Sequence, residues 1–521
     1  MDHPGSTSPR RPLFTERRSS SPRSAAGQRR LNGPGTLLVG TSLCVRQLLP
    51  SLLTLDPAPS LLGCLLPKPA ILPLAVLGGF DQLETIAQRC EVQQVLVSLP
   101  AVMDDQLRTI AATLDRLGVT WRYLPPLADQ LAGHATPRNS ARHTRSVDPA
   151  KLIDRQPRPL DEDAIRRTVT GKPVLITGAG GSIGSELAHV VARFRPSRLV
   201  LVERSENALF EIDRQIGRRY PDQPREAVLH DVTQADRTDD LIHRVRPAVV
   251  FHAAAHKHVP MMENHPAEAV ENNFYGTRSI ADAADRAGCE RFVMISTDKA
   301  VNPSSVMGAS KRLAELYIGH LNQRSDTTFC MVRFGNVLGS ACSLIPIWTD
   351  QLGRGGPITV THREMTRYFM TIPEAAGLVL QAGAYAGADS EGGSGGEVFL
   401  LDMGEPIRIL DMADRFLRLQ GFAPDVDVKI EITGPRPGEK LFEELAYTGE
   451  DMRPTPHESI RIWQSARPEP AQLQQIVSTL DRLRDKSADG SRRWRDTPSE
   501  AVVTALRSLL PEMVKPAAVA G

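Results

Sequence analysis

A hydroxyl, a carboxylate and an amine stand in three consecutive positions of this 521-residue sequence, Thr297-Asp298-Lys299. They follow an apolar run over residues 291–295 that is typical of a buried strand, and a helical stretch with Met307 and Lys311 comes next. Side chains at the carboxyl end of a parallel strand face the ligand site of open α/β sheets. An acid and a base held together there can move protons on one substrate. The sequence therefore predicts a catalytic centre around residues 297–311.

A glycine-rich turn, Thr177-Gly-Ala-Gly-Gly-Ser-Ile-Gly184, separates an apolar strand from a helical stretch. Gly178 permits a tight turn, Gly181 lets the backbone approach a diphosphate, and Gly184 lets helix and strand pack closely. The helix N-terminus then presents amide N–H groups to the phosphates. This pattern predicts a bound dinucleotide.

The next strand ends at Glu203, the position from which an acid binds the adenosine ribose hydroxyls. Arg204 beside it could instead bind a 2′-phosphate, so NAD and NADP both stay open, with NAD slightly favoured. Small residues after a third strand, over residues 253–255, would let the cofactor lie against the backbone. The other candidate cofactor contacts are Ser182, Ile183, Asp231, Val232, Ala253, Ala254, Ala255, Asn273 and Lys311.

The elements that must hold these residues divide the chain into five parts. We expect a disordered polar arm (1–34), a small α/β domain (35–130), a linker (131–165), a dinucleotide-binding catalytic domain (166–465) with its substrate lobe mainly at 340–450, and a helical tail (466–521). The first turn of the small domain, Gly40-Thr-Ser-Leu-Cys44, lacks the glycines that a diphosphate needs. This domain therefore resembles a degenerate nucleotide-binding domain.

Composition limits the partners. A net charge of +1 favours neither nucleic acid nor an anionic membrane surface as a partner. No run reaches the roughly 18 apolar residues of a membrane span, although peripheral membrane association stays open. The six cysteines show no metal-ligand spacing, so we expect no metal and a reducing, cytoplasmic location.

Taken together, these motifs resemble the extended short-chain dehydrogenase/reductases. That superfamily normally has a tyrosine four residues before the lysine, where this chain has Met307. One subgroup, the polysaccharide-biosynthesis UDP-N-acetylglucosamine 4,6-dehydratases, typically carries Thr-Asp-Lys followed by such a methionine. Further matching motifs are His256–Glu263, Val332–Gly339, Gly356–Met370 and Arg436–Lys440. The chain departs from the subgroup in having no transmembrane helices and in Ala341-Cys342, where Arg-Gly is usual.

The resemblance implies a fold and a reaction. The fold would be an extended short-chain dehydrogenase/reductase Rossmann fold with a smaller C-terminal substrate lobe, preceded by the small degenerate α/β domain. The reaction would be C4 oxidation of UDP-N-acetylglucosamine, loss of water across C5 and C6, and return of the hydride to C6. The product, a 4-keto-6-deoxy sugar, would serve cell-surface polysaccharide biosynthesis such as capsule or O-antigen.

The resemblance also implies residue roles. Asp298 would be the acid at the C6 hydroxyl, and Lys299 the base at C5. Lys299 can act as a base only if its pKa falls, which burial, neighbouring Lys311 and cofactor charge would achieve. Thr297 would bind the C4 hydroxyl, and Lys311 the nicotinamide ribose, whereas Met307 cannot transfer protons. The candidate substrate contacts are Lys257, Asn336, Arg367, Arg436 and Glu439.

Two other functions stay open. A UDP-sugar C4 epimerase would need only the oxidation step, which leaves Asp298 and Lys299 without a task. A non-catalytic dinucleotide or nucleotide-sugar sensor would fit the degenerate N-terminal domain, but not the retained Thr-Asp-Lys and Lys311. Because helix-pair dimerisation is common in the superfamily, we also expect a homo-oligomer.

Overall fold

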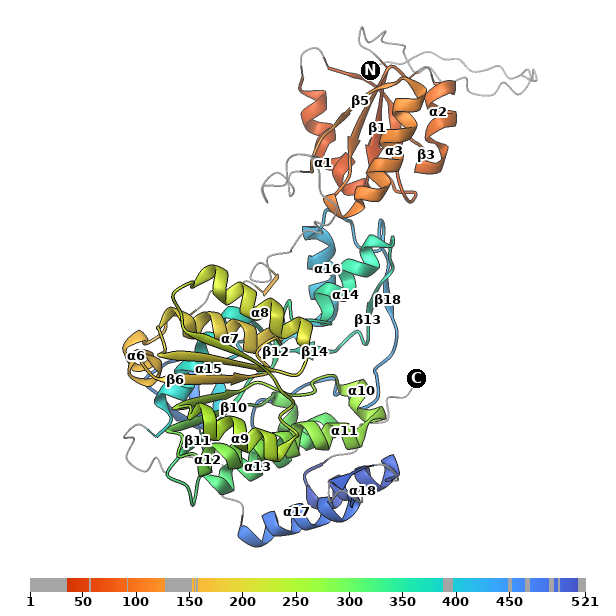
Figure 1. Cartoon of the computed structure of the whole chain (residues 1–521). Helices are drawn as coiled ribbons and strands as arrows, with labels where there is room; N and C mark the ends of the chain where they lie inside the picture. The colour runs from red at the N-terminus through yellow and green to blue at the C-terminus, as the bar shows by residue number, and fades with distance from the viewer. Residues whose placement is uncertain are drawn as a thin grey trace, which may run out of the picture.

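The computed structural model of the chain is shown in Figure 1. It describes residues 35–55, 58–90, 92–126, 152–153, 155, 158–387, 397–447, 452–463, 469–486, 492–494 and 497–513. The predicted arm at 1–34 and most of the predicted linker lie outside these residues. Helix α6 (Glu162–Val169) begins within the range predicted as linker.

The N-terminal domain is a parallel five-stranded sheet in the order β3-β2-β1-β4-β5. Its strands are β1 (Gly35–Gly40), β2 (Ser60–Leu65), β3 (Val76–Gly78), β4 (Gln94–Ser98) and β5 (Thr120–Tyr123). Its helices are α1 (Ser42–Leu53), α2 (Leu83–Arg89) and α3 (Asp104–Leu117). This arrangement confirms the α/β character predicted for this part of the sequence.

The domain predicted to be catalytic is built on a nine-stranded sheet in the order β19-β20-β16-β11-β10-β9-β6-β7-β8. Seven strands are parallel, and β20 pairs antiparallel with both β16 and β19. Their bounds are β6 (Pro173–Thr177), β7 (Arg198–Glu203), β8 (Arg225–Leu229), β9 (Val249–His252), β10 (Arg291–Ile295), β11 (Thr328–Arg333), β16 (Val398–Leu401), β19 (Met452–Pro454) and β20 (Ile460–Trp463). The strand order reverses between β6 and β9, which is where ligands bind in such sheets.

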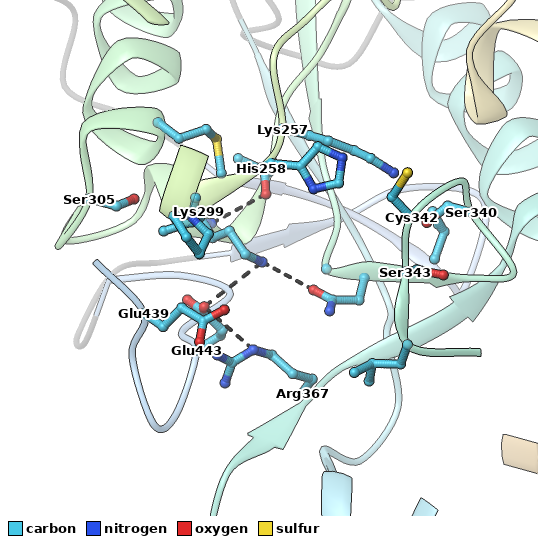
Figure 2. Close-up of a pocket in the computed structure, with 18 of the residues that line it drawn as sticks. Lys257, His258, Lys299, Ser305, Ser340, Cys342, Ser343, Arg367, Glu439 and Glu443 are labelled. Atoms are coloured by element: carbon cyan, nitrogen blue, oxygen red, sulfur yellow. Dashed lines mark hydrogen bonds and ion pairs between the residues drawn. The ribbon is translucent and has the colours of Figure 1, made fainter. Parts of the chain in front are cut away.

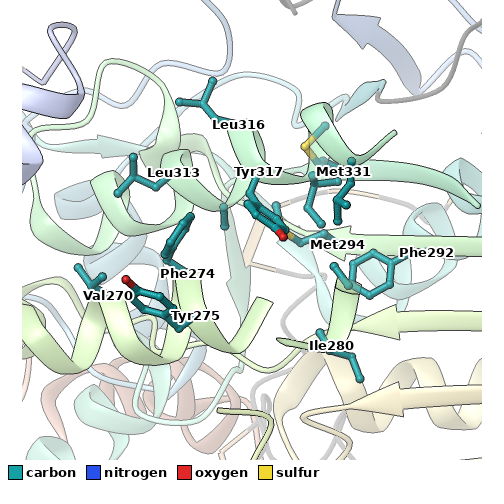
Figure 3. Packing of buried hydrophobic residues seen from close by; sticks show 14 of the residues in the cluster. Val270, Phe274, Tyr275, Ile280, Phe292, Met294, Leu313, Leu316, Tyr317 and Met331 are labelled. Atoms are coloured by element: carbon teal, nitrogen blue, oxygen red, sulfur yellow. The ribbon is translucent and has the colours of Figure 1, made fainter. Parts of the chain in front are cut away.

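Helices cover both faces of this sheet (Figure 1). One apolar core lies beneath α6, α7 (Ser182–Arg193), α8 (Glu206–Arg219) and α15 (Ile372–Tyr385). The other core, shown in Figure 3, lies beneath α9 (Ala235–Val245), α10 (Val259–Asn264), α11 (Pro266–Val270), α12 (Gly276–Arg286) and α13 (Val306–Leu321). The tail helices α17 (Pro470–Leu483) and α18 (Ser499–Leu509), both predicted from the sequence, add buried leucines to this second core.

The substrate lobe lies between the N-terminal domain and the nine-stranded sheet in Figure 1. It comprises β12 (Asn336–Leu338), α14 (Leu344–Gly353), β13 (Ile358–Val360), β14 (Thr366–Arg367), β15 (Phe369–Thr371), β17 (Ile407–Arg408), α16 (Ile409–Leu419) and β18 (Ile430–Ile432). Trp348 and Phe416 of this lobe share one apolar core with Leu37 and Leu114 of the N-terminal domain. The fold class predicted from the sequence is therefore confirmed, and the small domain packs on the lobe.

No helix among the described residues is long and apolar enough to span a lipid bilayer. None of the six cysteines, all of which lie within the described ranges, is in a disulfide. The described residues also contain no cluster of acidic, histidine or cysteine side chains that could hold a metal ion.

Candidate active site

A buried ion pair fixes the strand end that carries the catalytic candidates. Arg333 of β11 contacts Glu315 of α13 at 2.6 Å, and both side chains are 1% exposed. Ser296, which directly follows β10, donates a hydrogen bond of 2.7 Å to the same carboxylate. Burial opposes the charged carboxylate, but Arg333, Arg312 and Ser296 together outweigh burial and lower the pKa of Glu315 to about 2. The ion pair thus ties β10 and β11 to the helix that also carries Met307 and Lys311.

Thr297, Asp298 and Lys299 form one hydrogen-bonded cluster just beyond β10. The Thr297 hydroxyl and the Lys299 Nζ both donate to Asp298 Oδ1, each at 2.9 Å. Lys299 Nζ also donates to Asn336 Oδ1 at 3.1 Å and lies 3.8 Å from Glu443 Oε1 (Figure 2). Asp298 has no exposed surface, and its Oδ2 has no partner among the described residues.

The pKa of Lys299 is shifted in the direction opposite to the one that a base requires. Burial disfavours its ammonium, but the carboxylates of Asp298 and Glu443 outweigh burial and raise the pKa of Lys299. Lys311, expected to help lower this pKa, is not among the main causes of the shift. Lys299 therefore rests as an ammonium and must lose a proton before it can act as a base.

Lys311 has the opposite environment. It is 3% exposed, and its Nζ has no hydrogen-bond partner in the described part of the chain. Burial, only partly offset by Glu315, lowers the pKa of Lys311 to about 8. Lys311 and Met307, one turn apart on α13, both line the same pocket.

The glycine turn is packed too closely for larger residues. Gly178 has a φ of +64°, and a Cβ built there would lie 2.7 Å from the Ala254 nitrogen. A Cβ on Gly184 would lie 2.0 Å from the Gly178 carbonyl oxygen. Gly181 precedes the first residue of α7, so the turn leads directly into a helix N-terminus.

The acidic candidates near the turn differ in their surroundings. Glu203 Oε2 accepts from the Gly180 N–H at 3.1 Å, which places its carboxylate beside the glycine turn. Arg204 next to it is exposed, and its guanidinium lies 3.4 Å from the Asn272 side-chain oxygen. Asp231 Oδ1 instead accepts from the backbone and hydroxyl of Thr233, which makes it a turn-forming residue.

Two other predicted cofactor residues are directed into the protein. Asn273 has no exposed surface, and its amide binds the backbone of His256 and the Ser310 hydroxyl. Val232 is 5% exposed and lies against Gly276 of α12. Asn273 positions the segment after β9, and its direct contact with a cofactor stays a prediction.

A pocket of about 760 Å³ connects the glycine turn to the substrate lobe. Most of the predicted site residues line it, namely Gly181, Ser182, Ile183, Gly184, Ala253, Ala255, Lys257, Thr297, Lys299, Met307, Lys311, Asn336, Arg367, Arg436 and Glu439. Its wall also contains Ser340, Ala341 and Cys342, the segment that departs from the subgroup pattern. The structure thus brings residues from distant parts of the sequence to one cavity.

The cationic candidates differ in their exposure and in the groups that they already bind. Arg436 pairs with Glu439 at 2.6 Å, but its side chain is 53% exposed, so it can turn towards a ligand. Lys257 Nζ donates to the Ala341 carbonyl at 3.0 Å. The Arg367 guanidinium is 7% exposed and donates to the carbonyls of Thr366, Lys440 and Leu441. Arg367 therefore holds the loop at 440–441 in addition to lining the pocket.

Sequence reasoning missed Glu443. It lies three residues beyond the Arg436–Lys440 motif, in a segment with no helix or strand, and its side chain is 3% exposed. Figure 2 shows the Glu443 carboxylate next to Lys299 and Arg367. The signal in the sequence was an acidic pair, Glu443-Glu444, in an otherwise apolar stretch next to that motif.

Comparison with known proteins identifies the family. The sequence pattern of the family described as "Polysaccharide biosynthesis protein" matches residues 174–465. The chain belongs to this family. It is 44% identical over 382 residues to the probable polysaccharide biosynthesis protein EpsC of Bacillus subtilis, which covers 73% of the chain and 61% of EpsC. The capsular polysaccharide biosynthesis protein CapD of Staphylococcus aureus is also 44% identical, over 71% of the chain and 60% of CapD.

The chain thus spans about three fifths of the length of these two family members. Among solved structures, Pen from Bacillus thuringiensis superposes with a TM-score of 0.51 at 32% identity. That alignment covers 58% of this chain and 90% of Pen. It agrees with the short-chain dehydrogenase/reductase fold expected from the sequence.

Proposed function

We propose that this family member is a nucleotide-sugar 4,6-dehydratase that acts on UDP-N-acetylglucosamine with bound NAD or NADP. The observation that carries the proposal is the position of Lys299, which lines the pocket together with the glycine turn and Lys311 and donates a hydrogen bond of 2.9 Å to Asp298, buried directly behind the pocket wall. Elimination of water needs a base at C5 and an acid at the C6 hydroxyl. A reaction that only oxidises and reduces C4 has no use for them.

The residues present fit a nicotinamide dinucleotide. A side chain at Gly178 or Gly184 would collide with the backbone. Because glycines occupy both positions, the turn has no side chains there, and the diphosphate of a dinucleotide could approach its backbone closely. The Lys311 ammonium is buried, faces the pocket and has no described partner, as expected of a group that binds ribose hydroxyls. When bound, the dinucleotide would accept a hydride from C4 and return it to C6.

The protein's own residues would move the protons. Asp298, as a neutral acid, gives its proton to the C6 hydroxyl, which leaves as water. Lys299, as a neutral amine, takes the C5 proton. After elimination Asp298 is a carboxylate and Lys299 an ammonium, which is the ion pair seen in the structure. Lys299 would return its proton to C5 when the hydride returns to C6, and the proton released from the C4 hydroxyl would restore the ammonium. Thr297, which donates to Asp298, is placed to exchange that bond for one with the C4 hydroxyl.

The diphosphate and uridine would lie towards the substrate lobe. Arg436 is the freest cation on that side of the pocket, and a guanidinium can bind a phosphate with two hydrogen bonds. Glu439, released from Arg436, would accept from the ribose. The names of EpsC and CapD support a role in surface polysaccharide synthesis, such as capsule or O-antigen.

The test is product analysis. Purified protein is incubated with UDP-N-acetylglucosamine, and products are followed by mass spectrometry and NMR. We expect loss of one water, a new C6 methyl group and a C4 ketone or its hydrate. Lys299→Ala should lower the rate at least about a hundredfold, the usual contribution of a general base. A C4-inverted sugar of unchanged mass would instead establish an epimerase, and binding of both ligands without turnover would favour a sensor.

A further inference from the structure

Lys299 has two carboxyl neighbours, not one. Asp298 Oδ1 is 2.9 Å from its Nζ, and Glu443 Oε1 is 3.8 Å away on the opposite segment of chain. Both carboxyls are almost fully buried, with side-chain exposures of 0% for Asp298 and 3% for Glu443. One ammonium therefore neutralises two carboxyl groups that are shielded from solvent.

In each of these carboxyl groups, one oxygen has no hydrogen-bond partner among the described residues. Asp298 Oδ2 and Glu443 Oε2 are buried, and neither has a hydrogen-bond partner in the described part of the chain. For Glu443, a buried carboxylate oxygen without a donor is costly, which favours the neutral acid. The Arg367 Nε, 3.7 Å from Glu443 Oε1, offsets this cost only in part, because its guanidinium donates to backbone carbonyls.

Burial raises the pKa of Glu443 more than its cationic neighbours lower it. The charged groups that face Glu443 are Lys299, Asp298, Arg367 and Lys440. Those that face Lys299 are Asp298, Glu443 and Arg367. Of the groups that favour the Lys299 ammonium, Asp298 is the proposed acid, and Glu443 has no other task.

We propose that Glu443 controls the charge of Lys299: as a carboxylate it holds Lys299 as an ammonium, and as a neutral acid it lets Lys299 pass its proton to Asp298. In that transfer one N–H bond of Lys299 breaks and one O–H bond forms on Asp298. The result is a neutral amine beside a neutral acid, the pair that elimination requires. Glu443 is thus a positioning residue, and its part in catalysis rests on the proposed dehydratase function.

The first test needs no substrate. The pH dependence of Lys299 acylation by an amine-reactive anhydride is followed by mass spectrometry in the whole protein and in Glu443→Gln. Removing the carboxylate should lower the apparent pKa of Lys299 by about one unit or more, as expected for a charge within about 4–6 Å. An unchanged or higher apparent pKa would overturn the proposal.

Glu444→Gln is the matched control. Glu444 carries the same charge at the next position, but it pairs with Lys440 at 3.1 Å and accepts from Asn302 at 2.6 Å. We expect no shift for Lys299 in this variant, and an equal shift in both variants would contradict a specific role for Glu443. Glu443→Asp retains the charge, so it should retain most of the wild-type titration and also shows whether the site tolerates change.

The second test uses turnover. If the wild type releases dehydrated sugar, its rate should fall as the pH rises and Glu443 loses its proton. This basic limb of the pH–rate profile should move to higher pH in Glu443→Gln and stay in place in Glu444→Gln. Coincident profiles would reject the role of Glu443 while the dehydratase stands. If the wild type forms no dehydrated product, the proposed function fails, and the acylation result still decides whether Glu443 sets the charge of Lys299.

Discussion

At the scale of single residues, the two lysines of the site differ by their neighbours. Lys299 lies between carboxylates that raise its pKa, whereas burial lowers the pKa of Lys311 to about 8. The Lys299 side chain is 17% exposed and Lys311 is 3% exposed, so the two lysines differ more in their charged neighbours than in burial. Lys311 instead lacks a described partner for its Nζ. A buried ammonium without a partner destabilises the protein until a ligand binds it.

Lys311→Met should therefore stabilise the cofactor-free protein. The pKa of Lys311 is roughly 10.4 in the unfolded chain but about 8 in the folded chain. At pH 7 this difference lowers the free energy of unfolding by up to about 3 kcal/mol. That cost shrinks between pH 8 and roughly pH 10.4, so the gain from the variant should shrink over the same range. Urea unfolding at pH 7 and pH 9.5 measures both, and a less stable variant at pH 7 would contradict the argument.

At the scale of elements, the site depends on how β6 meets α7 and how β10 meets α13. The glycine turn packs β6 tightly against α7, because a Cβ on Gly184 would lie only 2.0 Å from the Gly178 carbonyl oxygen. The Glu315 carboxylate joins the second pair through Ser296 and Arg333. The catalytic cluster is thus placed by backbone packing on one side and by a buried ion pair on the other.

Gly184→Ala should disrupt the dinucleotide site. The added methyl group must displace the Gly178 backbone, so we expect at least a tenfold loss of NAD affinity, about 1.4 kcal/mol or more, and a lower melting temperature. Gly353→Ala is the control, because no atom lies within 4 Å of its built Cβ. Calorimetric titration with NAD compares the two, and equal affinities would show that the turn does not hold the cofactor.

At the scale of the whole molecule, the N-terminal domain meets the substrate lobe at its own ligand-binding edge. In its sheet the strand order reverses between β1 and β4, and the chain leaves β1 at Thr41. The Thr41 hydroxyl donates to the Gly421 carbonyl, and the Ser42 N–H donates to Asp427 Oδ1 at 3.2 Å. A carboxylate of the lobe thus lies at the α1 N-terminus, where a phosphate would lie in a nucleotide-binding domain. In the N-terminal domain, the edge that would bind a nucleotide is therefore covered by the substrate lobe of the same chain.

Asp427→Ala should loosen this contact. Asp427 is 3% exposed and also accepts from the Ala423 N–H at 2.8 Å, so we expect a loss of about 1–2 kcal/mol, as for a helix cap. Hydrogen exchange should rise at the start of α1 and in α14 and α16. Asp411→Ala, which removes an exposed carboxylate of α16, should leave exchange in α1 unchanged. Equal exchange in α1 for wild type and Asp427→Ala would contradict the role of this contact.

The tail helices show a further contact at this scale. Arg484 lies over the Tyr275 ring at 3.8 Å and pairs with Glu271 at 2.7 Å, while the Tyr275 hydroxyl donates to Asp481. Residues after α17 thereby cover part of the helical face formed by α11 to α13. The homo-oligomer expected from helix pairing stays a prediction, and it would have to use a surface that the tail leaves open.

The sequence by itself determined which groups are present and which strand or turn carries each. The glycine turn, the Thr-Asp-Lys segment after β10 and the Lys311 helix are local patterns, because a strand, a turn and a helix start each depend on a few neighbouring residues. Only the tertiary structure decided the charge of Lys299 and the position of the N-terminal domain. Glu443 and Asp427 reach their partners across long stretches of chain, and electrostatic energy depends on distance in space.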